Sequence, residues 1–392
     1  MSIDLQRLRA ETPGCRHVAH FNNAGSSLPP QPVLDVQIGH VQLESMIGGY
    51  EAAAKAAEQQ AAVYASIARL INCAPDEVAL IENATRAWDM AFYSLRFQPG
   101  DRILTSVAEY ASNYIAFLQI ARRQGVEILA VPNDDHGQIS VTALRDLIDA
   151  RVKLIAITHV PTNGGLIQPA AAVGAIARAH GIPYLLDACQ SVGQLQVDVE
   201  AIGCDFLSAT GRKYLRGPRG TGFLYVRRAW LDRLEPPFLD LHAANWVAAD
   251  RYEMLPDAKR FENWERSVAG VLGLGAAVDY ALAIGLPAIE ADLRRKAAIL
   301  RQKLAALPGV IVRDIGEEQG GIVTFTREGV ASADIKAGLA RSGINVSVSR
   351  RSSTYLDMTA RHLADVVRAS VHYYNAEEEI DRLVAAVGSI HA

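Results

Sequence analysis

Two kinds of hydrophobic pattern divide this chain of 392 residues. In the first, short β-branched runs alternate with helical stretches. The runs lie at 78–81, 102–107, 127–132, 153–160, 182–187, 205–210 and 222–226, and the helical stretches at 85–96, 112–124, 142–149 and 170–180. This alternation predicts βαβ units around a mostly parallel sheet. The runs LIAIT and YLLD are apolar on both faces, which indicates helices on both sides of that sheet.

The regions on either side of this alternation have other patterns. Residues 33–72 are rich in alanine and apolar at i, i+3 and i+4, which predicts two helices interrupted at Gly48 and Gly49. From about Ala288 onward, the order helix, strand, helix, strand, helix predicts a smaller α+β domain. We therefore expect an N-terminal segment (1–30) that lines the site, a large domain (31–280) and a small C-terminal domain (281–392).

The composition narrows the classes of partner. The chain is 50% hydrophobic and 21% charged with a formal net charge of -4, so it lacks the basic surface that nucleic acids require. No apolar run approaches the roughly 20 residues of a membrane span, and the N-terminus lacks a signal-type apolar region. We expect a cytoplasmic protein without membrane partners. The four cysteines have neither CxxC spacing nor a histidine cluster, which indicates no disulfide framework and no metal site.

Asp187 and Lys213 carry the strongest chemical signal. Each comes just after a hydrophobic run, at the strand ends where open α/β sheets bind ligands. A lysine amine can hold pyridoxal phosphate (PLP) as a Schiff base and move protons at a substrate α-carbon, while a carboxylate keeps the pyridine nitrogen protonated. Thr210, Arg212 and the turn GPRGTG supply a hydroxyl, a guanidinium and backbone N–H groups for a phosphate. The turn lacks the spacing of a dinucleotide motif and leads into a strand, so PLP is favoured over NAD.

From FNNAGSS near the start to VRASVHYYNAEEEID near the end, the sequence resembles the class-V, cysteine-desulfurase-like branch of fold-type-I PLP enzymes. The resemblance implies an α/β fold with a large, mostly parallel seven-stranded sheet and a smaller α+β C-terminal domain. It also implies a homodimer with sites at the interface, where residues 242–264 contact the partner subunit. The motifs NNAGSSLPP, HVPTNGG, DACQSVGQ, FENWERS and VSVS most resemble isopenicillin-N epimerase-like proteins and hercynylcysteine sulfoxide lyases.

The resemblance also implies further site residues. They are Ala84 and Thr85 for the phosphate, Tyr110 for stacking on the pyridine ring, Asn163 (or its neighbour Thr162) and Gln190 for the phenolic oxygen, and Arg368 and Asn23 for the substrate. Tyr110 departs from the desulfurases, which usually place histidine there. Thr85 could equally be an ordinary helix cap, and Asn23, with Asn22 and Gly25, an ordinary turn.

The sequence of the small domain bears on which reaction the protein catalyses. Desulfurases carry a nucleophilic cysteine shortly before the carboxylate-binding arginine, but residues 344–370 contain none, and Cys189 belongs to another loop. We expect carbon–sulfur β-elimination from a cysteine conjugate or sulfoxide, with pyruvate and ammonia as by-products. An amino-acid epimerase, a class-V aminotransferase and an inactive PLP-fold binding protein are the alternatives. Arg350 and Arg351 either meet an anionic distal part of the substrate or form a solvated pair.

Overall fold

A computed structural model describes residues 3–390, and its central feature is a seven-stranded sheet with the order β2-β8-β7-β6-β5-β3-β4. The strands are β2 (Val78–Ile81), β3 (Arg102–Ser106), β4 (Glu127–Val131), β5 (Val152–Thr158), β6 (Tyr184–Asp187), β7 (Phe206–Thr210) and β8 (Gly222–Val226). In this sheet β8 alone runs opposite to the other six strands. The predicted mostly parallel sheet, with a strand at each of the seven hydrophobic runs, is therefore confirmed.

Helices cover both faces of this sheet. They include α5 (Ala84–Phe92), α6 (Ala111–Gln124), α7 (Val141–Asp146), α8 (Ala170–Ala179) and α9 (Val199–Ile202). Leu185 and Leu186, which are neighbours in β6, pack into two different hydrophobic clusters. Successive strand residues point to opposite faces, so this division shows directly that both faces are buried.

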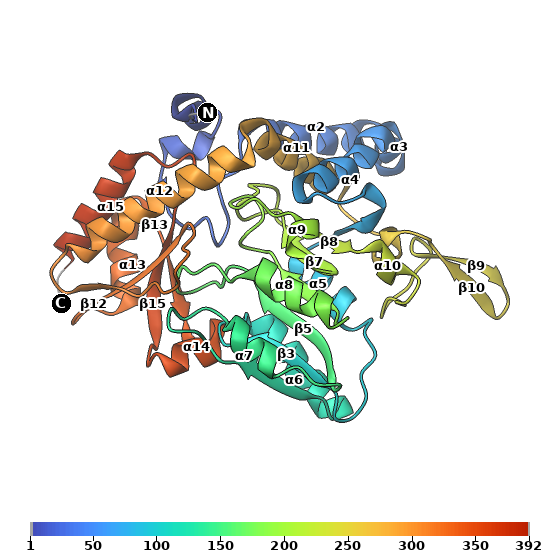
Figure 1. Ribbon diagram of the computed structural model, residues 1–392. Helices are drawn as coiled ribbons and strands as arrows, with labels where there is room; N and C mark the ends of the chain where they lie inside the picture. The colour runs from blue at the N-terminus through green and yellow to red at the C-terminus, as the bar shows by residue number, and fades with distance from the viewer. Residues whose placement is uncertain (1–2, 391–392) are drawn as a thin grey trace.

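The alanine-rich region after residue 30 forms three helices, so the prediction of two was wrong. They are α2 (Gln31–Ile47), α3 (Gly49–Lys55) and α4 (Ala57–Ile71). The first break lies at Gly48, whose φ of 99° suits glycine. The second lies at Ala56, where φ is -95° and ψ is 10°, and alanine gives no sequence signal for a break. The apolar helix α11 (Val268–Ile284) packs beside α2 and α4 (Figure 1).

The C-terminal part contains a four-stranded antiparallel sheet with the order β11-β12-β15-β14. Its elements are β11 (Val310–Val312), β12 (Ile322–Arg327), β14 (Ser347–Arg350), β15 (Asp365–Ser370), α12 (Leu286–Ala305), α13 (Ser332–Arg341), α14 (Tyr355–Ala360) and α15 (Glu377–Ser389). Near the N-terminus, β1 (Ala19–His20) pairs with β13 (Ile344–Asn345). The pairing fixes β1 to the C-terminal part, which is orange and red in Figure 1.

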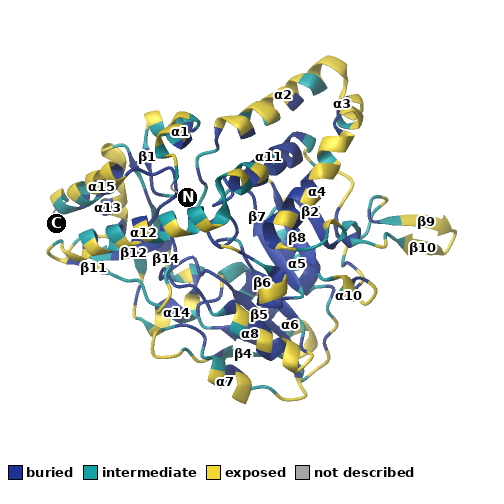
Figure 2. Cartoon of the chain, turned by 45° about the horizontal axis from the view of Figure 1, so that its top comes forward, coloured by how far each residue is buried: buried dark blue, intermediate teal, exposed yellow. Residues whose placement is uncertain are grey.

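A hairpin of β9 (Ala244–Ala248) and β10 (Arg251–Met254) projects from the body of the molecule (Figure 1). Figure 2 shows exposed residues along this hairpin and along α2 and α3, whereas α11 is mainly buried. Short helices complete the described chain: α1 (Leu5–Ala10), α10 (Arg228–Leu231) and the 3-10 turns Pro13–Arg16, Pro75–Glu77, Ala258–Phe261 and Arg351–Ser353. Within residues 3–390 no single helix has the length and apolar content of a membrane span. Helices α11 and α12 meet the length and apolar-content criteria only when they are taken together, and they are bent by 81° relative to each other.

Candidate active site

The carboxyl ends of the parallel strands bring the predicted residues of the large domain together. Asp187 is the last residue of β6 and Thr210 the last of β7, while Lys213 follows β7 by three residues. Parallel strands that are neighbours end at the same edge of a sheet, which is where ligands bind in such folds. The two residues that carry the PLP hypothesis therefore lie at one edge.

Lys213 lies half-buried at this edge. Burial lowers the pKa of its amine; the neighbouring Cys189 and Asp187 raise that pKa, and the guanidinium groups of Arg212 and Arg368 lower it. Within the described chain, no hydrogen bond or ion pair engages its Nζ. A lysine in this setting has a larger neutral fraction than a solvated one and is free to bond a carbonyl carbon.

The Asp187 carboxylate is buried and held by two donors. Its Oδ1 accepts from the backbone N–H of Cys189 at 2.9 Å, and its Oδ2 accepts from the Asn113 side chain at 3.0 Å. Asn113 also donates to Glu109 at 2.8 Å. Glu109 and Asn113 were missed from the sequence, although their spacing of four residues at the start of a helix is a signal that could have revealed them.

The predicted phosphate residues lie around the start of α5. Ala84 is buried and Thr85 is exposed there, and the helix cap is Asn83, which accepts from the backbone N–H of Arg86 at 3.0 Å. The alternative reading of Thr85 as the helix cap is therefore wrong. Gly222 lets this helix approach the sheet, because a Cβ there would lie 3.3 Å from the backbone nitrogen of Ala84.

Thr210 reaches the same region from the end of β7, whereas Arg212, in the loop after β7, turns toward the N-terminal segment. Thr210 pairs with Gly222 across the sheet, and its hydroxyl donates to the Thr221 carbonyl at 3.3 Å. The Arg212 guanidinium donates to the carbonyl of Gly25 in the N-terminal segment. Helix N-termini offer free N–H groups to anions, so this arrangement suits a phosphate.

Arg368 comes from β15 in the C-terminal part and is buried against the β5–α8 loop. Its guanidinium donates to the hydroxyl of Thr162 and, at 3.1 Å, to that of Ser347. Burial lowers its pKa, and the Tyr110 phenol raises it. The partners named here are hydroxyl groups, which leave the positive charge available for a substrate carboxylate.

The two candidates of the β5–α8 loop point in different directions. Thr162 meets Arg368, whereas Asn163 donates to Thr354 at 2.9 Å and to the Met358 sulfur at 3.0 Å. The structure thus turns Asn163 toward α14, and its assignment to the cofactor's phenolic oxygen stays a prediction. Tyr110 stands at the start of α6 with 36% of its surface exposed, as a stacking residue beside an open site would.

The N-terminal turn lies next to Gln190. The Gln190 amide donates to the Ala24 carbonyl at 3.1 Å, and its buried Oε1 has no partner in the described part of the chain. Asn23 is completely buried, donates to Ser370 O at 2.7 Å and accepts from the Tyr374 hydroxyl. These bonds fix the turn and occupy the Asn23 amide, so the structure does not offer it to a substrate.

The paired arginines after β14 differ from each other. Arg350 is exposed, whereas Arg351 is half-buried and donates to the Leu363 carbonyl at 2.9 Å. Arg350 thus lies in solvent, and Arg351 is bonded to the backbone through its Nε.

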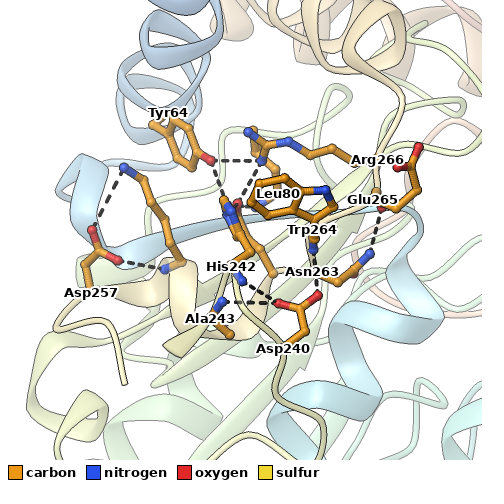
Figure 3. A network of polar contacts seen from close by, with 12 residues as sticks. Tyr64, Leu80, Asp240, His242, Ala243, Asp257, Asn263, Trp264, Glu265 and Arg266 are labelled. Carbon is orange, nitrogen blue, oxygen red and sulfur yellow. Dashed lines mark hydrogen bonds and ion pairs between the residues drawn. The ribbon is translucent and has the colours of Figure 1, made fainter. Parts of the chain in front are cut away.

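A second polar network orders residues 240–266 (Figure 3). The buried carboxylate of Glu262 accepts from Tyr64 at 2.8 Å, from His242 at 2.9 Å and from Arg266 at 2.7 Å. Asp240 accepts from the backbone N–H of Trp264 at 2.7 Å. The network fixes the backbone on both sides of the hairpin and leaves half of the Trp264 surface exposed.

The groups gathered at this edge fit pyridoxal phosphate. The Lys213 amine suits its aldehyde, the Asp187 anion suits its ring nitrogen, and the start of α5 suits its phosphate. The unpartnered oxygen of Gln190 lies buried at the same edge.

Comparisons with known proteins agree with this fit. The family model "Aminotransferase class-V" matches residues 19–383. A probable cysteine desulfurase 2 of Mycobacterium leprae is 33% identical, with 98% of this chain and 96% of the relative covered. The apo cysteine desulfurase of Thermococcus onnurineus NA1 superposes with a TM-score of 0.92 at 26% identity, over 99% of this chain and 98% of that one. A mutant of C-DES with glycine covalently linked to its PLP cofactor shares the fold, with a TM-score of 0.88 at 23% identity, over 98% and 99% of the two chains.

Proposed function

The chain belongs to the class-V aminotransferase family and uses pyridoxal phosphate, and we propose that it is a carbon–sulfur β-lyase acting on a cysteine conjugate or a cysteine sulfoxide. The relatives are named cysteine desulfurases, which also break a carbon–sulfur bond of an amino acid. In the proposed reaction the sulfur leaves with the product instead of passing to a cysteine of the enzyme.

Lys213 and Arg368 have different roles in this reaction. When bound, pyridoxal phosphate withdraws electrons from the substrate α-carbon and makes its proton acidic. Lys213 accepts that proton, since burial lowers the pKa of its amine and increases the neutral fraction. Arg368 binds the substrate α-carboxylate in a fork, with its guanidinium held by Thr162 and Ser347.

The observation that carries the proposal is the absence of a cysteine from the stretch that leads to Arg368. Residues 344–370, which run from β13 to β15, contain no cysteine, and a 3-10 turn and α14 occupy the stretch between β14 and β15. Cys189 is near Lys213, but burial raises the pKa of its thiol well above the ordinary value. A thiol in this state is a poor nucleophile.

The elimination needs no sulfur acceptor on the enzyme, because every atom of the substrate is accounted for in the products. The α-proton goes to Lys213, the carbon–sulfur bond breaks, and the sulfur leaves with the electron pair and a proton as a thiol, or as a sulfenic acid from a sulfoxide. Water then converts the remaining three-carbon enamine to pyruvate and ammonia. A single base suffices for these steps.

The test is to incubate the holoenzyme with cysteine S-conjugates, cysteine sulfoxides and cysteine, and to measure pyruvate and alanine. We expect pyruvate from a conjugate or sulfoxide, retained in Cys189→Ala and lost in Lys213→Ala. Alanine formed from cysteine, and lost in Cys189→Ala, would identify a desulfurase instead. Epimerised substrate without pyruvate would identify an epimerase, in which Tyr110, the phenol beside Arg368, is the candidate second acid.

We further propose a homodimer. Large apolar side chains are exposed around the projecting hairpin: Phe238 at 61%, Leu241 at 69%, Trp246 at 82% and Trp264 at 50%. Monomers rarely expose so many large apolar groups in one region, and a second copy of the chain would cover them. Light scattering should give twice the chain mass, and the double variant Leu241→Ser, Trp246→Ser should lower it, whereas Tyr355→Ser, exposed on α14, should not. A monomeric native protein would contradict this proposal.

A further inference from the structure

A chain of three buried side chains runs inward from the cofactor-facing carboxylate. The Asn113 amide nitrogen lies 3.0 Å from Asp187 Oδ2 and 2.8 Å from Glu109 Oε1. All three residues are at most 4% exposed. One amide therefore bridges two carboxyl groups that water does not reach.

Glu109 is fixed by the strands around it. Thr105 donates a hydroxyl to its carboxylate at 3.1 Å, and Thr158 donates its backbone N–H at 2.9 Å and its hydroxyl at 2.6 Å. A fifth donor is the N–H of Tyr110 at 3.2 Å. Networks in which every member is bonded are rigid, and a variant at one member disturbs the others.

Opposing effects act on the pKa of Glu109. Burial raises the pKa of Glu109 to about 7, the hydrogen bonds from Thr158 and Asn113 lower it, and Asp187 raises it. On the β6 side, the phenol of Tyr184 also senses Glu109.

The orientation of Asp187 depends on the same bridge. The terminal torsion of an aspartate is soft, so its plane is set by its hydrogen bonds. Here the donors are the Cys189 N–H on one oxygen and the Asn113 amide on the other. Removal of Asn113 would free one side of the carboxylate.

We propose that Glu109 and Asn113 are positioning residues, which hold the Asp187 carboxylate in one orientation toward the pyridine nitrogen of the cofactor. The inference rests on the cofactor and not on the proposed lyase reaction, so the two can fail separately.

The test compares the affinity of the apo protein for two probes, pyridoxal phosphate and its 1-deaza analogue, in which carbon replaces the ring nitrogen. Protein fluorescence reports the dissociation constant of each. Loss of a hydrogen bond to a charged group predicts that Asn113→Ala binds pyridoxal phosphate about tenfold more weakly or worse. Glu109→Gln, which keeps the shape, should weaken it several-fold. Neither variant should change the affinity for the deaza analogue by more than about twofold, because that probe has no nitrogen for Asp187 to hold.

Glu77→Gln is the matched control. Glu77 is also a buried carboxylate, but it accepts from the backbone of Ala74 and Arg228 beyond the site, so its variant should leave both affinities unchanged. Melting of each apo variant separates folding from binding, and Glu109→Gln decides the matter if Asn113→Ala does not fold. Equal weakening of both probes, or no weakening of pyridoxal phosphate, would overturn the proposal.

Discussion

Arg216 is a buried cation that joins three distant parts of the chain. Its guanidinium donates to the Thr12 hydroxyl at 2.6 Å, the Leu28 carbonyl at 2.8 Å and the Tyr373 hydroxyl at 3.0 Å. It also lies 5.1 Å from the ring centre of Tyr373 and 4.5 Å from that of Tyr374. No carboxylate forms an ion pair with it anywhere in residues 3–390, so hydrogen bonds and aromatic faces alone hold the charge.

The same arginine belongs to the loop that carries the cofactor lysine. The Arg216 N–H donates to the Lys213 carbonyl at 2.9 Å, and the Ser27 N–H donates to the Arg212 carbonyl at 2.9 Å. The N-terminal segment is thus fastened to the lysine loop at both ends of this turn. Loss of the guanidinium should loosen the segment and the site together.

We predict that Arg216→Met lowers the free energy of unfolding by about 3–5 kcal/mol. Methionine retains most of the buried stem but leaves the Leu28 carbonyl without a donor, which costs about 1–3 kcal/mol. The two hydroxyl partners can turn to other acceptors. The desolvated cation–π contacts contribute about 2 kcal/mol more.

Urea denaturation of the apo protein, followed by circular dichroism, measures this loss. Arg228→Met is the control, because Arg228 pairs with Asp76 at the surface and such pairs are worth about 1 kcal/mol at most. Limited proteolysis should cut residues 1–30 faster in Arg216→Met alone. Equal unfolding midpoints for the two variants would refute the reasoning.

Three more predictions concern the cofactor site. Lys213→Ala should lose the absorption band at about 410–430 nm, which a spectrum of the purified protein checks. Gly222→Ala should weaken pyridoxal phosphate binding about tenfold in a titration of the apo protein. The new Cβ would lie 2.5 Å from the Ala209 carbonyl oxygen and 3.3 Å from the Ala84 nitrogen at the start of α5. Gly39→Ala is the control in the same titration, because a Cβ there would meet open space. The rate at which the apo protein takes up pyridoxal phosphate should rise with pH and level off below 10.5, because burial lowers the pKa of Lys213 and only the neutral amine reacts; a stopped-flow pH series measures it.

The large sheet could be predicted from the sequence because each of its strands is a short apolar run between turns. The strand that carries Arg368, β15, was not predicted, because a charged side chain interrupts its apolar pattern. The break between α3 and α4 at Ala56 was missed for the opposite reason, since nothing in the local sequence marks it. Local patterns fail where tertiary packing decides the backbone.

The site residues also divide into those that local sequence reveals and those that only the tertiary structure reveals. Asp187 and Lys213 could be found from the sequence because both follow strands that end at one edge of the sheet. The contact between Arg368 and Thr162 spans 206 positions, and that between Asn113 and Asp187 spans 74. Such pairs depend on how the strands and domains are placed, and no spacing rule within one segment reveals them.

Asn23 and Gln190 show why residue type alone does not identify a ligand contact. Both are buried amides beside the site, and both were predicted to bind a ligand. The Asn23 amide donates to Ser370 O and accepts from Tyr374, so it is already bonded on both sides. Gln190 donates to Ala24, but its oxygen has no partner within the described chain. A buried polar atom without a partner is costly unless a ligand satisfies it, so the oxygen of Gln190 is better evidence for the cofactor than the number of polar residues nearby.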